Sequence, residues 1–409
     1  MTARAPSIDT PFTLPCGRTL KNRVMKSAMT EGMADERGQV TDALVRLYQR
    51  WSHGGAGVLV TGNVMVDARY LERPGNLAVD KDTPLEGLRR LARAGTEGGN
   101  ELWMQISHPG RQCPRIANQK PVSASDVPLR ILGNFARPRA LASDEVDRII
   151  ERYAQTAGRA QAAGFTGVQI HAAHGYLISQ FLSPITNRRT DGWGGSLEER
   201  ARFLLSIVRA TRRAVGDDFP IAVKMNSADF QRGGFAPEDS RRVAGWLNDE
   251  RVDLLEISGG TYEQLRFVGR VGNEATHQEP AAEMADGTRQ REAYFLDYTQ
   301  ALRNAVRIPL AVTGGFRQRA FMNETLAADE LDVVGVARPL CAHPHVVNRL
   351  LTGAIDRLPS DENGKRLGPG WIGPSSPSSS VRALNSQASV AWFYRQMLRV
   401  ATDREPLQD

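Results

Sequence analysis

Two histidines and a tyrosine stand close together in the segment 171–176, which reads His-Ala-Ala-His-Gly-Tyr. Neutral imidazoles at His171 and His174 can each donate a hydrogen bond to one carbonyl or phenolate oxygen, and so stabilise negative charge that develops there. Tyr176 can donate a proton at neutral pH, because the usual pKa of a phenol is about 10. The same spacing also fits half of a metal site, or two histidines held by hydrogen bonds in the core. The combination favours an oxyanion site with a proton donor beside it.

Small and basic residues near positions 314 and 338 suit a phosphate group. Gly314 and Gly315 follow one apolar run, and Ala337 and Arg338 follow the next one. Small residues let backbone N–H groups approach an anion, and a guanidinium neutralises it through a bidentate contact. Either motif alone is also typical of an ordinary turn. Their order along the chain predicts one shared anion site.

Two further polar side chains lie in or beside apolar runs. A lysine such as Lys224 in an apolar run requires an anionic or carbonyl partner, unless its ammonium reaches solvent at the rim. The Gln105 amide can donate and accept at once, which suits the edge of a heterocycle such as the pyrimidine of a flavin. A purely structural hydrogen bond is the alternative for Gln105.

These residues need a scaffold that brings them together. Short apolar runs alternate with longer amphipathic segments, as is typical of parallel strands buried on both faces. Eight such units favour a single (β/α)8 TIM barrel over an open sheet, and no G-x-G-x-x-G motif follows the first run. In a barrel, the candidate residues at the strand ends would share the carboxyl-terminal face, where such folds carry chemistry. The predicted strands are 24–29, 58–63, 102–107, 167–171, 221–225, 254–258, 310–313 and 332–336.

The intervening segments carry helix start and stop signals. Ser143 is the predicted N-cap of a helix that ends at Gly164. The sequence 196–199, Ser-Leu-Glu-Glu, is a capping box for a helix that ends before Gly216. Pro237 fits the first turn of another helix. These signals support the alternation of strands and helices.

Two regions depart from the alternating pattern. Residues 112–142 are rich in Pro and Arg and predict a long excursion after the third strand. Residues 360–380 are rich in Gly, Pro and Ser and predict a loose connection to a last helix at 381–401. We expect residues 1–355 to form the barrel, and residues 356–409 to form a linker and a helical tail on the barrel or on a neighbouring subunit.

Composition limits the class of protein. The 409-residue chain has a net charge of +6 without a basic block, which disfavours nucleic-acid binding. Its three cysteines form no C-x-x-C pair, which argues against disulfide scaffolds, zinc ribbons and iron–sulfur clusters. We see no signal peptide and no apolar run of membrane-spanning length, so we expect a soluble cytoplasmic protein.

With these residues in view, the chain resembles the Old Yellow Enzyme family of FMN-dependent NADH:flavin oxidoreductases and ene-reductases. The similarity runs from about residue 12 to residue 350. Its most specific part is the segment 171–184, His-Ala-Ala-His-Gly-Tyr-Leu-Ile-Ser-Gln-Phe-Leu-Ser-Pro, followed by Thr-Asn-Arg-Arg-Thr-Asp-Gly-Trp-Gly-Gly-Ser at 186–196. Supporting motifs lie at 22–25, 230–235 and 257–260.

The resemblance implies roles for the matching residues. His171 and His174 would hold the substrate oxygen, and Tyr176 would protonate the α-carbon. Lys224 stands where many members carry Arg and would lie near the flavin N1 and O2. Gly32 replaces a substrate-contacting Tyr of some relatives, which leaves substrate preference open. Ala28 and Ala337 replace a common Pro and Gly. The implied FMN-binding residues are Ser27, Ala28, Met29, Thr30, Gly62, Gln105, Lys224, and, for the phosphate, Gly314, Gly315, Ala337 and Arg338.

The implied activity is NAD(P)H-dependent reduction of the activated C=C bond of α,β-unsaturated carbonyl compounds by a ping-pong mechanism. The implied cofactor is FMN, and homo-oligomers are common among relatives. An amine or betaine demethylase on the same fold is one alternative. A flavin-free phosphate-binding barrel lyase, with Lys224 as a Schiff-base lysine, is an alternative from another class.

Overall fold

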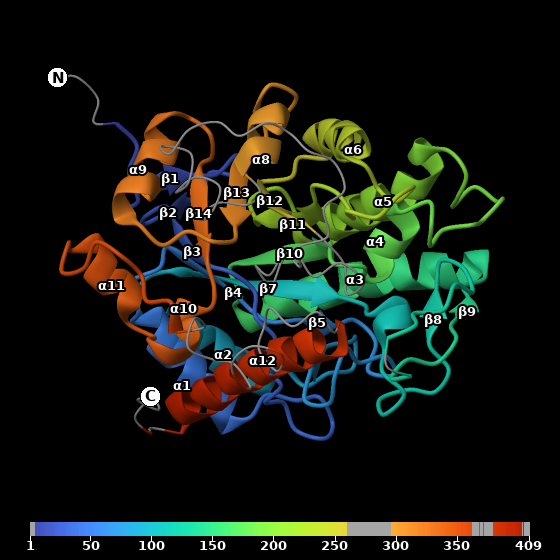
Figure 1. The fold of residues 1–409 in the computed structure, drawn as a ribbon, viewed down its shortest axis with the longest axis horizontal. Helices are drawn as coiled ribbons and strands as arrows, with labels where there is room; N and C mark the ends of the chain where they lie inside the picture. The colour runs from blue at the N-terminus through green and yellow to red at the C-terminus, as the bar shows by residue number, and fades with distance from the viewer. Residues whose placement is uncertain are drawn as a thin grey trace.

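The computed structural model describes residues 5–131, 133–259, 296–361 and 379–402, together with Gly368, Trp371 and Arg404. Eight parallel strands form a closed barrel, because β10 pairs with β11 on one side and with β7 on the other (Figure 1). The barrel strands, in spatial order, are β10 (Gly167–Ala172), β11 (Ile221–Asn226), β12 (Leu254–Ser258), β13 (Leu310–Thr313), β14 (Val333–Val336), β3 (Val24–Lys26), β4 (Val58–Val60) and β7 (Glu101–Ser107). All eight predicted strands and the barrel are therefore confirmed.

Two strands are shorter than predicted at the end that carries the candidate site. β3 ends at Lys26 and β4 ends at Val60, three residues before the predicted limits in each case. The Ser27 N–H still donates to the Val336 carbonyl of the neighbouring strand, at 2.9 Å. Beyond these points the chains leave the sheet, and their polar residues turn over the barrel mouth.

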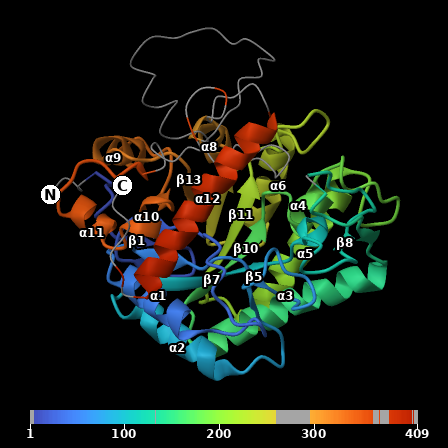
Figure 2. The same cartoon turned by 60° about the horizontal axis from the view of Figure 1, so that its bottom comes forward.

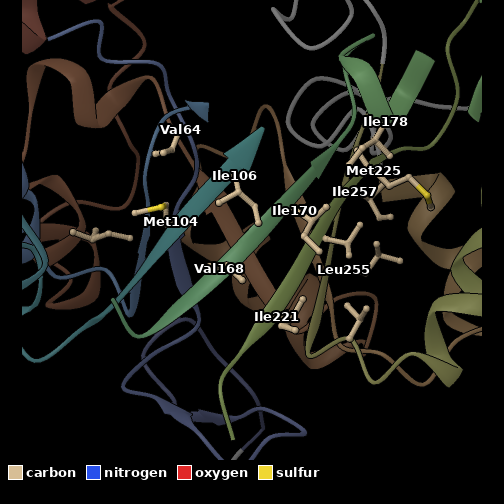
Figure 3. Packing of buried hydrophobic residues seen from close by; sticks show 14 of the residues in the cluster. Val64, Met104, Ile106, Val168, Ile170, Ile178, Ile221, Met225, Leu255 and Ile257 are labelled. Carbon is tan, nitrogen blue, oxygen red and sulfur yellow. The ribbon is translucent and has the colours of Figure 1, made fainter. Parts of the chain in front are cut away.

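Helices surround the barrel and bury its outer surface. Figure 3 shows side chains of this outer core, among them Ile106, Ile170 and Ile257 from three of the barrel strands. The barrel helices, in chain order, are α1 (Asp42–Ser52), α2 (Leu85–Thr96), α3 (Ser143–Ala163), α4 (Leu177–Leu182), α5 (Leu197–Val215), α6 (Pro237–Asp249), α8 (Leu296–Arg303), α9 (Arg319–Ala327), α10 (Pro339–Ala342) and α11 (Val346–Leu351).

The helix signals are confirmed with one correction. Ser196 Oγ accepts from the Glu199 N–H at 3.2 Å, and the Glu199 carboxylate accepts from the Ser196 N–H at 3.0 Å, which completes the predicted capping box. The N-cap of α3 is Ala142 and not Ser143, because the Glu145 carboxylate satisfies the Ala142 N–H at 2.8 Å. Gly164 ends α3 with φ +94°, the left-handed conformation that favours glycine.

The barrel interior has two chemically different ends. Alternate residues of each strand point inward, so consecutive inward layers are two residues apart. At the amino-terminal end of the strands the inward side chains are apolar, and we call this the apolar end. It is covered by the hairpin of β1 (Phe12–Thr13) and β2 (Thr19–Leu20), which sequence analysis did not predict. Its core contains Leu14, Leu20, Met25, Val58, Val60, Trp103, Ala222, Leu254, Ala311 and Val333.

The inward side chains of the next layers are polar, and we call this the polar end. Most of its members lie two or four residues beyond an apolar-end residue of the same strand, and two come from β10, which adds no residue to the apolar end. They are Ser27, Gln105, Gln169, His171, Lys224, Asn226, Glu256, Ser258 and Thr313, all but Thr313 at most 3–4% exposed. The boundary between the two ends is therefore set within each strand.

Short elements line the mouth of the barrel. β5 (Val64–Met65) pairs with β6 (Leu77–Ala78) and with the end of β7. The predicted excursion at 112–142 is present and holds the paired strands β8 (Val122–Ser123) and β9 (Arg139–Ala140), after the 3₁₀ turn Gly110–Gln112. Helix α12 (Ser379–Ala401) packs against α1 and α10, and Figure 2 shows it running diagonally in front of the barrel strands.

The predicted last helix is thus confirmed and begins two residues early. Most of the predicted loose connection at 360–380, and position 260 of the motif at 257–260, lie outside the described residues. No helix in the described part of the chain is both long enough and apolar enough to cross a bilayer.

Candidate active site

His171, His174 and Tyr176 form one cluster at the polar end. His171 is on β10, and the following turn returns the chain so that all three rings meet. The His171 ring centroid lies 5.1 Å from that of His174 and 4.8 Å from that of Tyr176, and both contacts are edge-on. His174 has φ +61°, a left-handed conformation that is uncommon outside glycine. The turn that gathers the rings therefore depends on strained backbone.

Both imidazoles are neutral near pH 7. Burial, followed by the positive charge of Lys224, lowers the pKa of His171 well below its usual range. The same two causes, with His171 as a third, lower the pKa of His174. His171 Nδ1 accepts from the Ala173 N–H at 3.2 Å, so the ring proton of the neutral form is on Nε2. Each ring is thus available in the neutral state that sequence analysis required of an oxyanion site.

His174 is fixed by the two strands that follow β10. Its N–H donates to Asn226 Oδ1 at 3.0 Å, and its Nε2 shares a hydrogen bond of 2.7 Å with Ser258 Oγ. Asn226 ends β11 and Ser258 ends β12, so three adjacent strands define the position of one imidazole. Sequence analysis assigned no site role to Asn226 or Ser258, although both are polar residues at strand ends.

Asn63 is a further site residue that sequence analysis missed. Its Nδ2 lies 3.3 Å from Tyr176 Oη and 3.4 Å from Thr30 Oγ1. The side chain is 6% exposed, and its Oδ1 has no hydrogen-bond partner among the described residues. Asn63 therefore links the predicted proton donor to Thr30 and leaves a buried polar atom suited to a ligand.

Lys224 and Gln105 are joined by a chain of two hydrogen bonds and one ion pair across four adjacent strands. Gln105 Nε2 donates to Gln169 Oε1 at 2.7 Å, and Gln169 Nε2 donates to Glu256 Oε2 at 2.7 Å. Glu256 Oε1 pairs with Lys224 Nζ at 2.9 Å. The predicted anionic partner of Lys224 is therefore a protein carboxylate. Sequence analysis missed Glu256, although it carries the same signal as Lys224, a charged residue within an apolar run.

Gly62 and residues 27–30 meet where β3 and β4 leave the sheet. A side chain at Gly62 would collide with Glu31 Oε2 and the Met29 carbonyl, and its N–H donates to Glu31 Oε1 at 2.9 Å. Ser27 Oγ shares a 2.6 Å hydrogen bond with Thr313 Oγ1. Ala28 and Met29 are half-buried, and Met29 Sδ lies 3.3 Å from Cys341 Sγ. The local requirement for glycine is thus explained by backbone crowding.

The two predicted phosphate loops follow neighbouring strands. Gly314 and Gly315 come directly after β13 with φ +141° and +85°, and Ala337 and Arg338 come directly after β14. β13 and β14 are paired, so the two loops leave the barrel side by side. All four residues are half-buried. Successive backbone N–H groups in such glycine conformations, with a guanidinium nearby, suit an anion.

The described residues contain no group of three or more His, Cys, Asp and Glu side chains arranged to hold a metal ion. The site brings together two neutral histidines, the Gln105 amide and Lys224 one layer further into the barrel, and the loops that follow β13 and β14. All three groups lie toward the carboxyl-terminal ends of the strands, where barrel enzymes carry their chemistry.

The sequence profile of the NADH:flavin oxidoreductase / NADH oxidase family matches residues 7–356. The NADH-dependent flavin oxidoreductase nadA of Aspergillus parasiticus is 35% identical over 406 residues, covering 95% of this chain and 84% of that protein. The NADH-dependent flavin oxidoreductase iliE of Hypocrea jecorina is 38% identical over 359 residues, covering 82% and 86%. The solved Old Yellow Enzyme homologue from Zymomonas mobilis matches with a TM-score of 0.73 and 24% identity, over 87% of this chain and 95% of that one.

Proposed function

The chain belongs to the NADH:flavin oxidoreductase / NADH oxidase family, and from that premise we propose that it uses FMN and NADH to reduce the activated C=C bond of α,β-unsaturated carbonyl compounds. The observation that carries the proposal is the cluster of two neutral imidazoles with a phenol beside them. Such a cluster suits a substrate that presents a carbonyl oxygen and needs a proton on a nearby carbon.

The residues at the polar end fit FMN. Gln105 and Lys224 would hold the polar edge of the isoalloxazine ring, because an amide and an ammonium match its alternating acceptors and donors. The Gly314–Gly315 and Ala337–Arg338 loops would hold the phosphate. The buried Ser27 and Gly62 and the half-buried Ala28, Met29 and Thr30 would line the ring. The unpartnered Asn63 Oδ1 supports a ligand in this space. When bound, FMN would supply hydride transfer from NADH to the electron-poor alkene.

The chain's own residues would handle the substrate oxygen and one proton. His171 and His174 would bind the carbonyl oxygen and stabilise its negative charge as hydride arrives at the β-carbon. Because their pKa values are lowered, both rings stay neutral and donate without titrating near pH 7. Tyr176 would deliver its proton to the α-carbon, and the product would have gained one hydride and one proton.

Two observations favour this reading over the flavin-free lyase. A Schiff-base lysine attacks a substrate carbonyl through its amine nitrogen, whereas Lys224 Nζ lies 2.9 Å from the Glu256 carboxylate and is held in an ion pair. The two relatives compared above are called NADH-dependent, which supports NADH as the reductant.

The test is an anaerobic two-stage experiment on the purified protein loaded with FMN. We expect NADH to bleach the flavin absorbance and 2-cyclohexenone to restore it without oxygen. Bleaching that is reversed only by oxygen would contradict reduction of simple enones and move the search to amines or larger acceptors. The Tyr176→Phe variant is the internal control, since it removes the proton donor while keeping the ring contact with His171.

A further inference from the structure

A buried ion pair lies at the polar end of the barrel. Lys224 on β11 is 4% exposed and Glu256 on β12 is 0% exposed, and the two residues are direct neighbours in the strand register. Removing two charges from water costs several kcal/mol per ion, and a hydrophobic pair of similar volume would often be as stable. The ion pair therefore contributes little to the stability of the fold, which points to a different role.

Glu256 also fixes the orientation of two amides. An ionised carboxylate only accepts hydrogen bonds, so Gln169 must present its NH2 group to Glu256 and its oxygen to Gln105. Gln105 in turn must present its own NH2 group to Gln169. The charge at Glu256 thus determines the orientation of both amides: that of Gln169 directly, and that of Gln105 through Gln169.

The pair also decides the net charge of this layer. His171 and Lys224 are neighbours in the register of β10 and β11, and both histidines are neutral. Glu256 cancels the charge of Lys224, so the inward groups around Gln105 carry no net positive charge. A reduced flavin bears more negative charge than an oxidised one and is stabilised by a nearby cation.

We propose that Glu256 is a positioning residue of the flavin site: it sets the redox potential of the bound flavin by cancelling the charge of Lys224, and it supports FMN binding by fixing the amide of Gln105. The inference rests on the proposed function in one respect, that FMN binds at the polar end. Its effect is on the cofactor and does not depend on the identity of the oxidising substrate.

The first test is the Glu256→Gln variant, which keeps the shape and removes the charge. In the FMN-loaded protein, titrated against a redox dye without oxygen, we expect reduced flavin to be favoured over oxidised flavin at least tenfold more than in wild type. For a two-electron couple this is a rise of about 30 mV. The matched control is Glu250→Gln, which removes a carboxylate paired with Arg209 outside the barrel and should leave the potential unchanged.

Three further variants separate the effect of the charge from that of the amide chain. Lys224→Met should disfavour reduced flavin at least tenfold, and the double variant Lys224→Met/Glu256→Gln, which is again neutral, should return within about threefold of wild type. Gln169→Met leaves the ion pair intact and should weaken binding of oxidised FMN by threefold or more with little change in potential. The double variant also covers the case in which Glu256→Gln alone does not fold.

The outcomes separate this inference from the proposed function. Wild-type protein that binds no FMN overturns both. A second outcome is that wild-type protein binds FMN, but Glu256→Gln and Lys224→Met each change the preference for reduced over oxidised flavin by less than twofold. That outcome overturns the role of Glu256 and leaves the proposed flavoenzyme function intact. Unchanged FMN binding in Gln169→Met overturns the part that involves Gln105.

Discussion

The apolar and polar ends of the barrel share most of their strands, yet one is lined by packed apolar side chains and the other by buried polar ones. Trp103 and Gln105 are both inward residues of β7, as are Ala222 and Lys224 on β11, and Leu254 and Glu256 on β12. At the apolar end the side chains only pack. Two residues further along, they form hydrogen bonds and an ion pair whose members come from four strands.

The difference separates stability from chemistry within each strand. The apolar end is sealed by Leu14 and Leu20 of the β1–β2 hairpin, and burial there contributes roughly 1.5–3 kcal/mol for each large side chain. Burial contributes less stability at the polar end, because each buried polar group first loses its hydration. We therefore expect substitutions at the apolar end to change unfolding, and substitutions at the polar end to change flavin and substrate chemistry.

The largest effect should come from Trp103→Ala at the apolar end. Trp103 is fully buried, and loss of its side chain from a packed core should lower the free energy of unfolding by about 3–5 kcal/mol. Urea unfolding gives this value. Turnover with NADH and enone at 20 °C, below the unfolding transition, should stay within about threefold of wild type. A loss of turnover without a loss of stability would show that the apolar end also contributes to catalysis.

The converse variant is His171→Ala with His174→Ala at the polar end. Removing donors to a developing oxyanion costs about 10²–10³-fold in rate for one donor, so the enone half-reaction should slow at least that much. Stopped-flow reoxidation of the reduced enzyme by 2-cyclohexenone measures it. The stage that oxidises NADH and the urea midpoint should change little. Intact enone reduction would show that the histidines do not bind the substrate oxygen.

An intermediate effect should appear on acidification. Burial lowers the pKa of His108, which follows β7, to about 4, while the unfolded value is about 6.5. Between these values the unfolded chain binds a proton that the folded chain does not, so stability falls as pH falls. His108 alone should cost about 2 kcal/mol between pH 7 and pH 5, and His171 and His174 act in the same direction. Urea unfolding at the two pH values tests this.

The variant His108→Gln sharpens the same experiment. It removes the titrating group, so its stability should depend less steeply on pH than that of wild type, whatever its absolute stability. Equal wild-type stability at pH 7 and pH 5 would contradict the neutral state of the buried histidines His108, His171 and His174 in the folded protein.

The smallest effect should follow Thr313→Val, which removes one hydrogen bond and keeps the side-chain shape. Thr313 Oγ1 and Ser27 Oγ join β13 to β3 at 2.6 Å. Loss of this bond should reduce the free energy of unfolding by about 1 kcal/mol. Bound flavin should be retained, because the variant leaves the predicted phosphate contacts and the other residues that would line the ring in place. A large loss of bound flavin would show that the hydrogen bond between Ser27 and Thr313 is needed to hold the ring.

The strands, the barrel and most helix boundaries could be predicted because they depend on local pattern. Apolar runs such as 221–225 and the capping box at 196–199 carry their signal in adjacent residues. The partners within the site could not be predicted, because they depend on strand register. Glu256 meets Lys224 only when β11 and β12 pair in one register, and Asn63 meets Tyr176 only when the barrel closes.

Some local predictions also failed, for physical reasons. Residues 27–29 look like strand by composition, yet they leave the sheet to reach the barrel mouth. Ser143 is a good N-cap residue, but Glu145 caps the backbone one residue earlier. The β1–β2 hairpin was missed because two-residue strands carry almost no periodicity.

The most direct test of the account is whether the polar end holds FMN through its phosphate. We would record the visible spectrum of the purified protein and then titrate the flavin-free protein with FMN and with riboflavin. The account predicts a yellow protein with one FMN per chain, and FMN binding at least 100-fold tighter than riboflavin, a difference of about 2.7 kcal/mol that the anion site at the β13 and β14 loops would supply. A colourless protein that binds neither flavin, or one that binds both equally, would contradict it.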